Sequence, residues 1–203
     1  MQLHKPDVVD AATAILDNYG IADLTMRRLA RELNVSPGAL YWHFANKQEL
    51  LGAVADRILQ PVRVEGSAVA WPGRIHQTCG ALRDALLSHT DGAELVSSSF
   101  AAGQSQIVGE IVAQLAAAAR DAGVVSPDDE LAARTVLYYV LGFTADEQSR
   151  LQWDAAGALG DEQSVLDRDT SRQFAFGLQL LVDGLAVRGA STLSSGRDGW
   201  QRS

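Results

Sequence analysis

A short cationic segment near the N-terminus holds the side chains best suited to bind an anion. Between residues 24 and 48 four cations face a single acid, Glu32, which gives a local charge of +3; the four are Arg27, Arg28, Arg31 and Lys47. An arginine can bind a guanine edge with two parallel hydrogen bonds, or it can bind a phosphate. Tyr41 and His43 offer hydrogen bonds to phosphate oxygens, which fix register without reading sequence. These residue types predict contact with DNA.

The rest of the chain is acidic and restricts where DNA can bind. The net charge is −8, which by itself argues against a nucleic-acid-binding protein. DNA contact must therefore be confined to residues 24–48. The acidic remainder would also orient the protein, because it is repelled from phosphates.

Two short helices joined by a tight turn are expected to position these side chains. Thr25 caps the first, which ends near Leu33, where Asn34 can adopt the left-handed conformation. Ser36 and Pro37 give the second a strong start signal, and it runs to about Phe44. A helix-turn-helix places its second helix in the major groove and lays the first across the backbone. The contacts expected to fix their angle are Ala30, Leu33, Val35 and Leu40.

Helices are predicted for the whole chain, which is assigned to the all-α class. Apolar residues make up 47% of it, there are only five prolines, and Val and Ile form no alternating runs. Asn46 opens a fourth helix, with Glu49 completing a capping box, and Pro61 ends it. Helices before and after it are expected at Lys5–Tyr19, Arg74–His89, Ser105–Ala122, Asp128 to about Trp153, and Thr170–Arg188. A polar loop spans Asp154–Asp169.

The single cysteine, Cys79, rules out an internal disulfide framework and fits a reducing compartment. No signal peptide opens the sequence, and no apolar run is long enough to span a membrane. We therefore expect a cytoplasmic protein without a membrane partner.

Two other classes of function compete with DNA binding. An enzyme is disfavoured because the sequence has no glycine-rich phosphate loop, no metal-ligand spacing and no nucleophile motif. We expect no catalysis, no cofactor and no metal. A helical interaction module could instead dock an acidic partner on its cationic patch. Salt-sensitive, sequence-specific retention of a DNA palindrome separates this alternative from a DNA-binding regulator.

Three segments resemble the signature of the tetracycline-repressor (TetR) family. They are Leu24–Ala30, Leu40–Phe44 and Asn46–Leu51, in the right order and spacing. The similarity continues through Ala85–Ala93 and Leu141-Gly142, which resemble the tetracycline repressors themselves. The resemblance implies an all-helical homodimer that binds operator DNA and responds to a small-molecule effector. Residues 1–48 would then serve DNA binding and residues 49–188 effector binding and dimerisation. The segment 189–203, after the last expected helix, is expected to be a flexible tail.

The resemblance also assigns the DNA-binding residues. They are Thr25, Arg27, Pro37, Gly38, Ala39, Tyr41, Trp42, His43 and Lys47. Where tetracycline repressors carry polar base-reading side chains, this sequence has Pro37 and Ala39. Those two offer only apolar contact, for example to a thymine methyl group, so the operator sequence should differ.

Two C-terminal helices are expected to form the dimer interface. The segments Leu131–Trp153 and Thr170–Arg188 are apolar on more than one side. Gly177 and Gly184 lie one heptad apart, and these small residues would allow a second subunit to approach closely. A helix that is apolar nearly all round must be buried, either against a partner or in a monomeric core. The resemblance favours a four-helix interface with the second subunit.

The resemblance places the effector between the middle helices, in an apolar cavity. The candidate residues are Arg63, Thr78, Leu82, Val96, Ser99, Phe100, Val112, Tyr138 and Asp146. Each of them could equally be ordinary core packing. Val96 stands where tetracycline repressors have a metal-binding histidine, and one carboxylate, Asp146, holds magnesium weakly. We therefore expect a repressor that a metal-independent, largely apolar effector releases from a palindromic operator.

Overall fold

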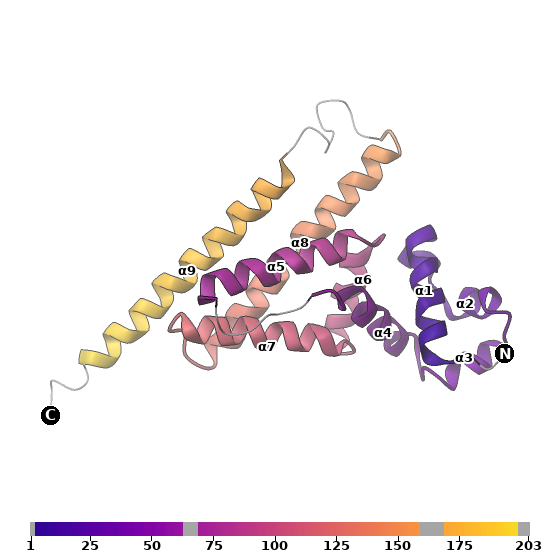
Figure 1. The fold of residues 1–203 in the computed structure, drawn as a ribbon, viewed down its shortest axis with the longest axis horizontal. Coiled ribbons are helices and arrows are strands. Elements are labelled where there is room, and N and C mark those ends of the chain that lie inside the picture. The colour runs from indigo at the N-terminus through magenta and orange to yellow at the C-terminus, as the bar shows by residue number, and fades with distance from the viewer. Residues whose placement is uncertain (1–2, 63–68, 159–168, 199–203) are drawn as a thin grey trace.

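The computed structural model describes residues 3–62, 69–158 and 169–198. Within these ranges the chain forms nine α-helices and one short 3₁₀ helix, and it contains no strand. The predicted all-α class is confirmed. The first three helices gather at one end of the molecule, and the C-terminal end of the last helix lies at the other (Figure 1).

The N-terminal part has the predicted helix order. Its elements are α1 (Lys5–Tyr19), η1 (Ile21–Asp23), α2 (Met26–Glu32), α3 (Pro37–Tyr41) and α4 (Lys47–Leu59). Side-chain oxygens of Thr25, Ser36 and Asn46 cap α2, α3 and α4, accepting from the N–H three residues later at 3.1, 3.3 and 2.9 Å. These bonds satisfy N–H groups that the helix itself leaves free.

The chain reverses at two residues with positive φ. Gly20 ends α1 with φ 79° and ψ 173°, a conformation open to glycine but outside the left-handed helical region, and Asn34 follows α2 with φ 52°, as predicted. Two details differ from the predictions. The regular part of α3 stops at Tyr41, and a hydrogen-bonded turn continues to Phe44. Glu49 accepts from Ala45 N at 3.0 Å, one residue before the Asn46 cap.

The body consists of five further helices. They are α5 (Trp71–Leu87), α6 (Gly92–Ala101), α7 (Gln106–Asp121), α8 (Asp128–Ala155) and α9 (Thr170–Asp198). The short helix α6 was not predicted, because Gly92 and a run of three serines give a weak helical signal and burial stabilises the helix instead. Much of the predicted loop at Asp154–Asp169 lies outside the described residues.

The predicted tail from Gly189 is wrong as to secondary structure, because α9 continues through it to Asp198. Gly189 is buried against the end of α7: a Cβ atom there would lie 1.8 Å from the Ala122 carbonyl oxygen. Close packing of two backbones, and not the end of a helix, thus explains the glycine.

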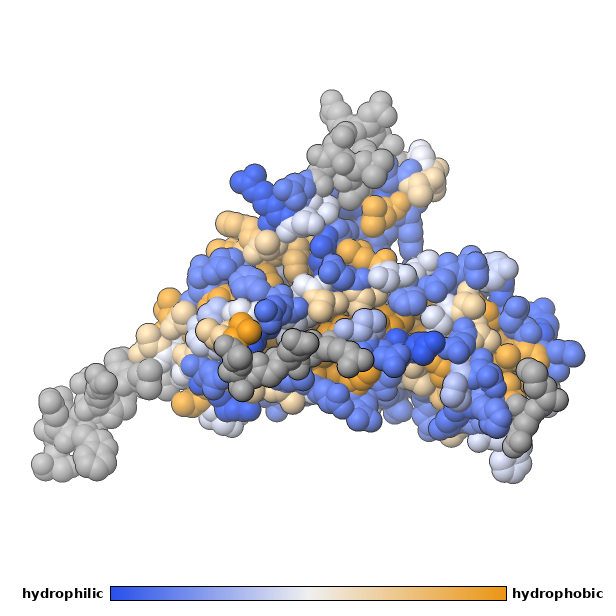
Figure 2. Space-filling view, viewed as in Figure 1, coloured by the Kyte–Doolittle hydropathy of each residue, from blue (hydrophilic) through white to orange (hydrophobic). Residues whose placement is uncertain are grey.

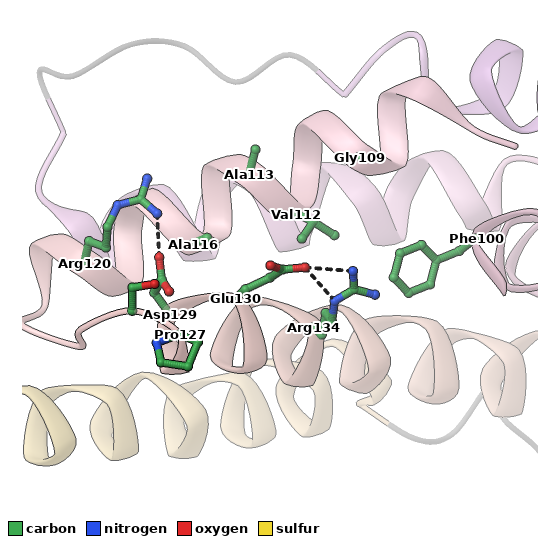
Figure 3. A pocket seen from close by; sticks show the side chains of 11 residues that line it. Phe100, Gly109, Val112, Ala113, Ala116, Arg120, Pro127, Asp129, Glu130 and Arg134 are labelled. Atoms are coloured by element: carbon green, nitrogen blue, oxygen red, sulfur yellow. Dashed lines mark hydrogen bonds and ion pairs between the residues drawn. The ribbon is translucent and has the colours of Figure 1, made fainter. Parts of the chain in front are cut away.

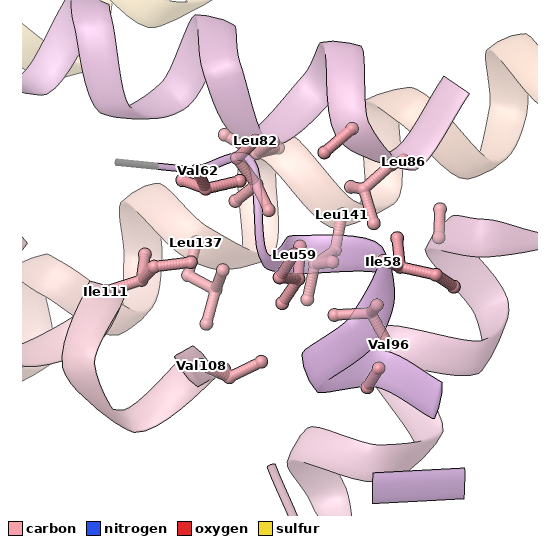
Figure 4. Close-up of a cluster of buried hydrophobic side chains, with 14 of the residues drawn as sticks. Ile58, Leu59, Val62, Leu82, Leu86, Val96, Val108, Ile111, Leu137 and Leu141 are labelled. Carbon is pink, nitrogen blue, oxygen red and sulfur yellow. The ribbon is translucent and has the colours of Figure 1, made fainter. Parts of the chain in front are cut away.

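The core lies where α4 enters the body. Ile58 and Leu59 of α4 point into a cluster with Leu82, Val96 and Leu141 (Figure 4). Full burial of one such side chain stabilises the fold by about 1.5–3 kcal/mol. Because α4 packs against α1 as well as α6 and α7, it joins the two predicted regions, whose boundary at residue 48 stays a prediction.

Candidate nucleic-acid interface and effector pocket

Helix α3 and the turn after it present large side chains to solvent. Trp42 is 91% exposed and Tyr41 is 52% exposed, whereas Leu40 and Phe44 are buried in the core. The two buried residues fix the orientation of the segment. Tyr41 and Trp42 thus project from a segment that is anchored in the core, and the described residues leave them largely exposed.

All nine residues predicted to contact DNA lie at the surface of α2, α3 and the start of α4. Those exposed are Thr25, Arg27, Pro37, Gly38, Tyr41 and Trp42, and those half-buried are Ala39, His43 and Lys47. Thr25 and Lys47 each stand at a helix start, where free N–H groups and the helix dipole favour a phosphate.

The cations of this region divide into two groups. Arg28 forms an ion pair with Asp23 and lies 3.7 Å from the centre of the Tyr19 ring, so it holds α2 against η1 and α1. Among the described residues no ion pair uses the other three, which are Arg27, Arg31 and Lys47. These three retain their positive charge for an external anion.

A pocket of about 500 Å³ lies between α7 and α8 (Figure 3). Residues spaced three or four apart along α7 form one wall, the N-terminal half of α8 forms the other, and Phe100 of α6 closes one end. The lining residues are Phe100, Gly109, Val112, Ala113, Ala116, Arg120, Ser126, Pro127, Asp129, Glu130 and Arg134.

The charges in this pocket neutralise one another. Arg120 donates to Asp129 at 2.6 Å, and this hydrogen bond lowers the pKa of the Asp129 carboxyl below its ordinary value. Arg134 donates to Glu130 through Nε and Nη2 at 3.1 and 2.8 Å, which raises the arginine's pKa. Two cations and two acids leave no net charge. The remaining lining is largely apolar.

The nine predicted effector residues fall into four groups. Phe100 and Val112 line the pocket. Tyr138 is 58% exposed beside it, with its ring 5.9 Å from that of Phe100. Arg63 lies outside the described residues. The other five lie elsewhere: Thr78, Leu82, Val96 and Ser99 are buried in the body, and Asp146 is exposed and paired with Arg150.

Sequence reasoning missed the charged part of the lining. Acids at the start of α8, such as Asp129 and Glu130, also fit the positive end of the helix dipole, which hides their place in the pocket. One signal was present: Gly109, Val112, Ala116 and Arg120 have the spacing of a single helix face. Nothing local shows that the N-terminal half of α8 lies opposite this face.

The DNA-binding end also contacts the body through the turn between α5 and α6. Asp91 accepts from Ile21 N at 2.9 Å and from the Gln152 side chain at 2.6 Å. His89 lies 3.0 Å from the Asp17 carboxylate, and Thr90 donates to the Asp17 carbonyl at 2.9 Å. The end of α1 is thereby fixed to the body.

Within the described residues of a single chain, α8 and α9 leave several apolar side chains exposed. Leu131 and Tyr138 of α8, and Phe176, Leu180 and Val187 of α9, are each more than half exposed. Orange apolar groups are visible among polar ones around these projecting helices (Figure 2). A pocket of about 350 Å³ between α8 and α9 includes Leu131 and Leu180. No helix in the described ranges is long and apolar enough to cross a membrane.

Comparison with known proteins shows the family. Residues 8–54 match the model of the bacterial regulatory proteins of the tetR family, and residues 67–168 match that of the tetracyclin repressor-like C-terminal domain. The class E tetracycline repressor protein of Escherichia coli is 30% identical over 199 residues, covering 92% of each chain.

Two solved structures are more similar. The crystal structure of BioQ from Mycobacterium smegmatis is 72% identical, with a TM-score of 0.87 over 93% of this chain and 100% of that one. BioQ with its natural double-stranded DNA operator is 68% identical, with a TM-score of 0.81 over 91% and 99% of the two chains. The N-terminal helix-turn-helix, the exposed cations and these matches agree: the chain belongs to the TetR family of dimeric, DNA-binding transcription regulators.

Proposed function

We propose that this protein is a repressor whose dimer binds a near-palindromic operator and is released when a small molecule enters the pocket between α7 and α8. The observation that carries the DNA part is the exposed surface of α3 and the turn after it, where Trp42 is 91% exposed, together with Arg27, Arg31 and Lys47, which form no ion pair within the described residues. Support comes from the similar BioQ, whose structure holds its own operator. Two α3 helices would enter successive major grooves about 34–36 Å apart.

The roles of Lys47 and Arg27 on DNA can be separated by substitution. Lys47→Ala should weaken binding to every duplex and reduce the slope of log affinity against log salt by about one. Arg27→Ala should lose about 1–3 kcal/mol more on a selected duplex than on random DNA, since a bidentate base contact discriminates by that amount. Equal losses on both duplexes, measured by fluorescence anisotropy, would reassign Arg27 to a phosphate.

The pocket supports an uncharged, largely apolar effector. Each charged side chain of the lining is paired with an opposite charge, so the pocket does not require a charged effector. Phe100, Val112 and Ala116 offer apolar contact. Side-chain chemistry also supports metal independence. Val96 has no lone pair and is fully buried, and Asp146 is already paired with Arg150.

Tetracycline with and without magnesium tests this effector class. We expect neither mixture to release the protein from a selected DNA duplex in a gel-shift titration. Release that requires magnesium would show a metal-chelate site of the tetracycline-repressor kind, and it would overturn the proposed effector class.

A bulky side chain placed in the pocket tests whether the effector binds there. A metabolite screen should find compounds that raise the melting temperature by about 5–11 °C at 100 times Kd, since this corresponds to about 2.7 kcal/mol. Ala113→Trp should abolish that shift. Glu110→Trp is the matched control, because Glu110 is exposed on α7 and does not line the pocket. Equal shifts in both variants would place the effector elsewhere.

A further inference from the structure

We infer that Asp56 is the positioning residue that couples the effector pocket to the DNA-binding helices, because its carboxylate on α4 caps the N-terminus of α7. This coupling role rests on the proposed function, in which an effector releases the protein from DNA. The contact itself is a property of the fold.

The first three free N–H groups of α7 all have partners, and two of them are on Asp56. Its carboxylate accepts from Ile107 N at 3.0 Å and from Gln106 N at 3.4 Å. The third N–H, of Val108, donates to Ser105 Oγ at 3.2 Å, and that hydroxyl in turn donates to Asp56 at 2.6 Å. A negative charge is stabilised at this end of the helix dipole. The cap of α7 thus depends on a residue of α4.

Backbone packing makes this contact rigid. Gly52 lies one turn before Asp56 on the same face of α4, and it is buried. A Cβ atom at Gly52 would lie 2.3 Å from the Gln104 carbonyl oxygen, just before the start of α7. The helix α4 and this turn therefore touch without intervening side chains. A shift of one must move the other, because packed elements do not deform continuously.

This contact connects the DNA-binding helices with the wall of the proposed effector pocket. Lys47, expected on a DNA phosphate, and Asp56 are nine residues apart on one straight helix, about 14 Å. On the other side, Gly109 and Val112 of the pocket wall follow the capped turn of α7 directly. A displacement of the α7 wall is thereby transmitted to α4 and to the preceding helix α3.

Hydrogen exchange of the intact dimer tests the coupling from the DNA side, so no effector is needed. The probe is a DNA duplex selected by the wild-type protein from a random pool. Coupling is reciprocal, so DNA bound at α3 should slow exchange of the Gln106 and Ile107 amides by about fivefold or more. In Asp56→Ala these amides should exchange about 5 to 30 times faster, as expected for a lost cap, and DNA should no longer affect them.

Three controls separate coupling from general destabilisation. Asp169→Ala removes an acid that accepts from Arg172 N at 2.9 Å at the start of α9, and it should keep the DNA effect on α7. The Ile21 amide, bound to Asp91, should respond to DNA equally in all variants. Asp56→Asn, which keeps one acceptor oxygen, should restore part of the coupling and serves if Asp56→Ala does not fold.

The outcomes are distinct. A wild-type protein without DNA-linked slowing at α7, or an Asp56→Ala protein that keeps it, overturns the inference. Failure of the proposed effector site would instead appear as an unchanged melting-temperature shift in Ala113→Trp. The exchange experiment uses neither that variant nor an effector, so the two failures are distinguishable.

Discussion

The buried ion pair between α5 and α8 allows a quantitative test of the fold. Arg83 donates to the Glu147 carboxylate through Nε at 2.9 Å and through Nη2 at 2.6 Å. The two side chains are only 11% and 6% exposed. The Arg83 guanidinium also lies 5.2 Å from the centre of the Phe174 ring of α9. One arginine therefore joins three helices.

Arg83→Met should lower the free energy of unfolding by about 3–5 kcal/mol, because it leaves the Glu147 carboxylate buried without a partner. This corresponds to a melting temperature about 6–20 °C lower for a chain of this size. Arg134→Met is the control: its pair with Glu130 is more exposed, and the expected loss is below about 1 kcal/mol.

Urea unfolding at one fixed protomer concentration measures these losses, since the stability of a dimer depends on concentration. The double variant Arg83→Met with Glu147→Leu should recover most of the loss, because it removes both charges and keeps apolar volume. The reasoning is refuted if Arg83→Met loses less than about 1 kcal/mol. It is also refuted if the double variant is as unstable as the sum of the two single ones.

Three further predictions concern α9 and the core. Leu180→Glu should yield a folded monomer in sedimentation experiments, because Leu180 is 57% exposed in the single chain and needs a partner to be covered; a dimer at micromolar concentration would contradict this. Gly177→Ala should lower the melting temperature, because the added Cβ would lie 2.3 Å from the Tyr139 hydroxyl; an unchanged value would mean that the ring moves easily. Burial raises the pKa of the Cys79 thiol to about 12, so the native protein should resist iodoacetamide at pH 8 while the unfolded chain reacts. Because the thiol ionises first in the unfolded chain, stability should fall as pH rises from about 9 toward 12; rapid native labelling would contradict the burial.

The structure changes how two residues of the predicted dimer helix are understood. Gly177 was expected to allow close approach of the second subunit, but it faces Tyr139 of the same chain. A Cβ atom at Gly184 would meet no described atom within 4 Å, so close approach of the second subunit at this residue stays a prediction. Leu178 is buried within the chain, so a charge there would disturb folding before dimerisation.

The sequence by itself determined where most helices begin, because a helix start depends on a few neighbouring atoms. A hydroxyl or amide at Thr25, Ser36 or Asn46 accepts an N–H three residues later whatever the rest of the chain does. The residues that the TetR resemblance assigns to DNA lie at the surface for a similar reason. They all lie within one short segment, and their exposure follows from the apolar spacing of α2 and α3.

Only the tertiary structure decided the rest. The pocket combines α6, α7 and α8, and its ion pair between Arg120 and Asp129 forms because two helices meet. Gly189 allows α9 to pack closely against Ala122, and the cap of α7 depends on Asp56, about fifty residues earlier. Such contacts join residues that are far apart in sequence. Local propensity and periodicity carry no information about which distant backbone will approach.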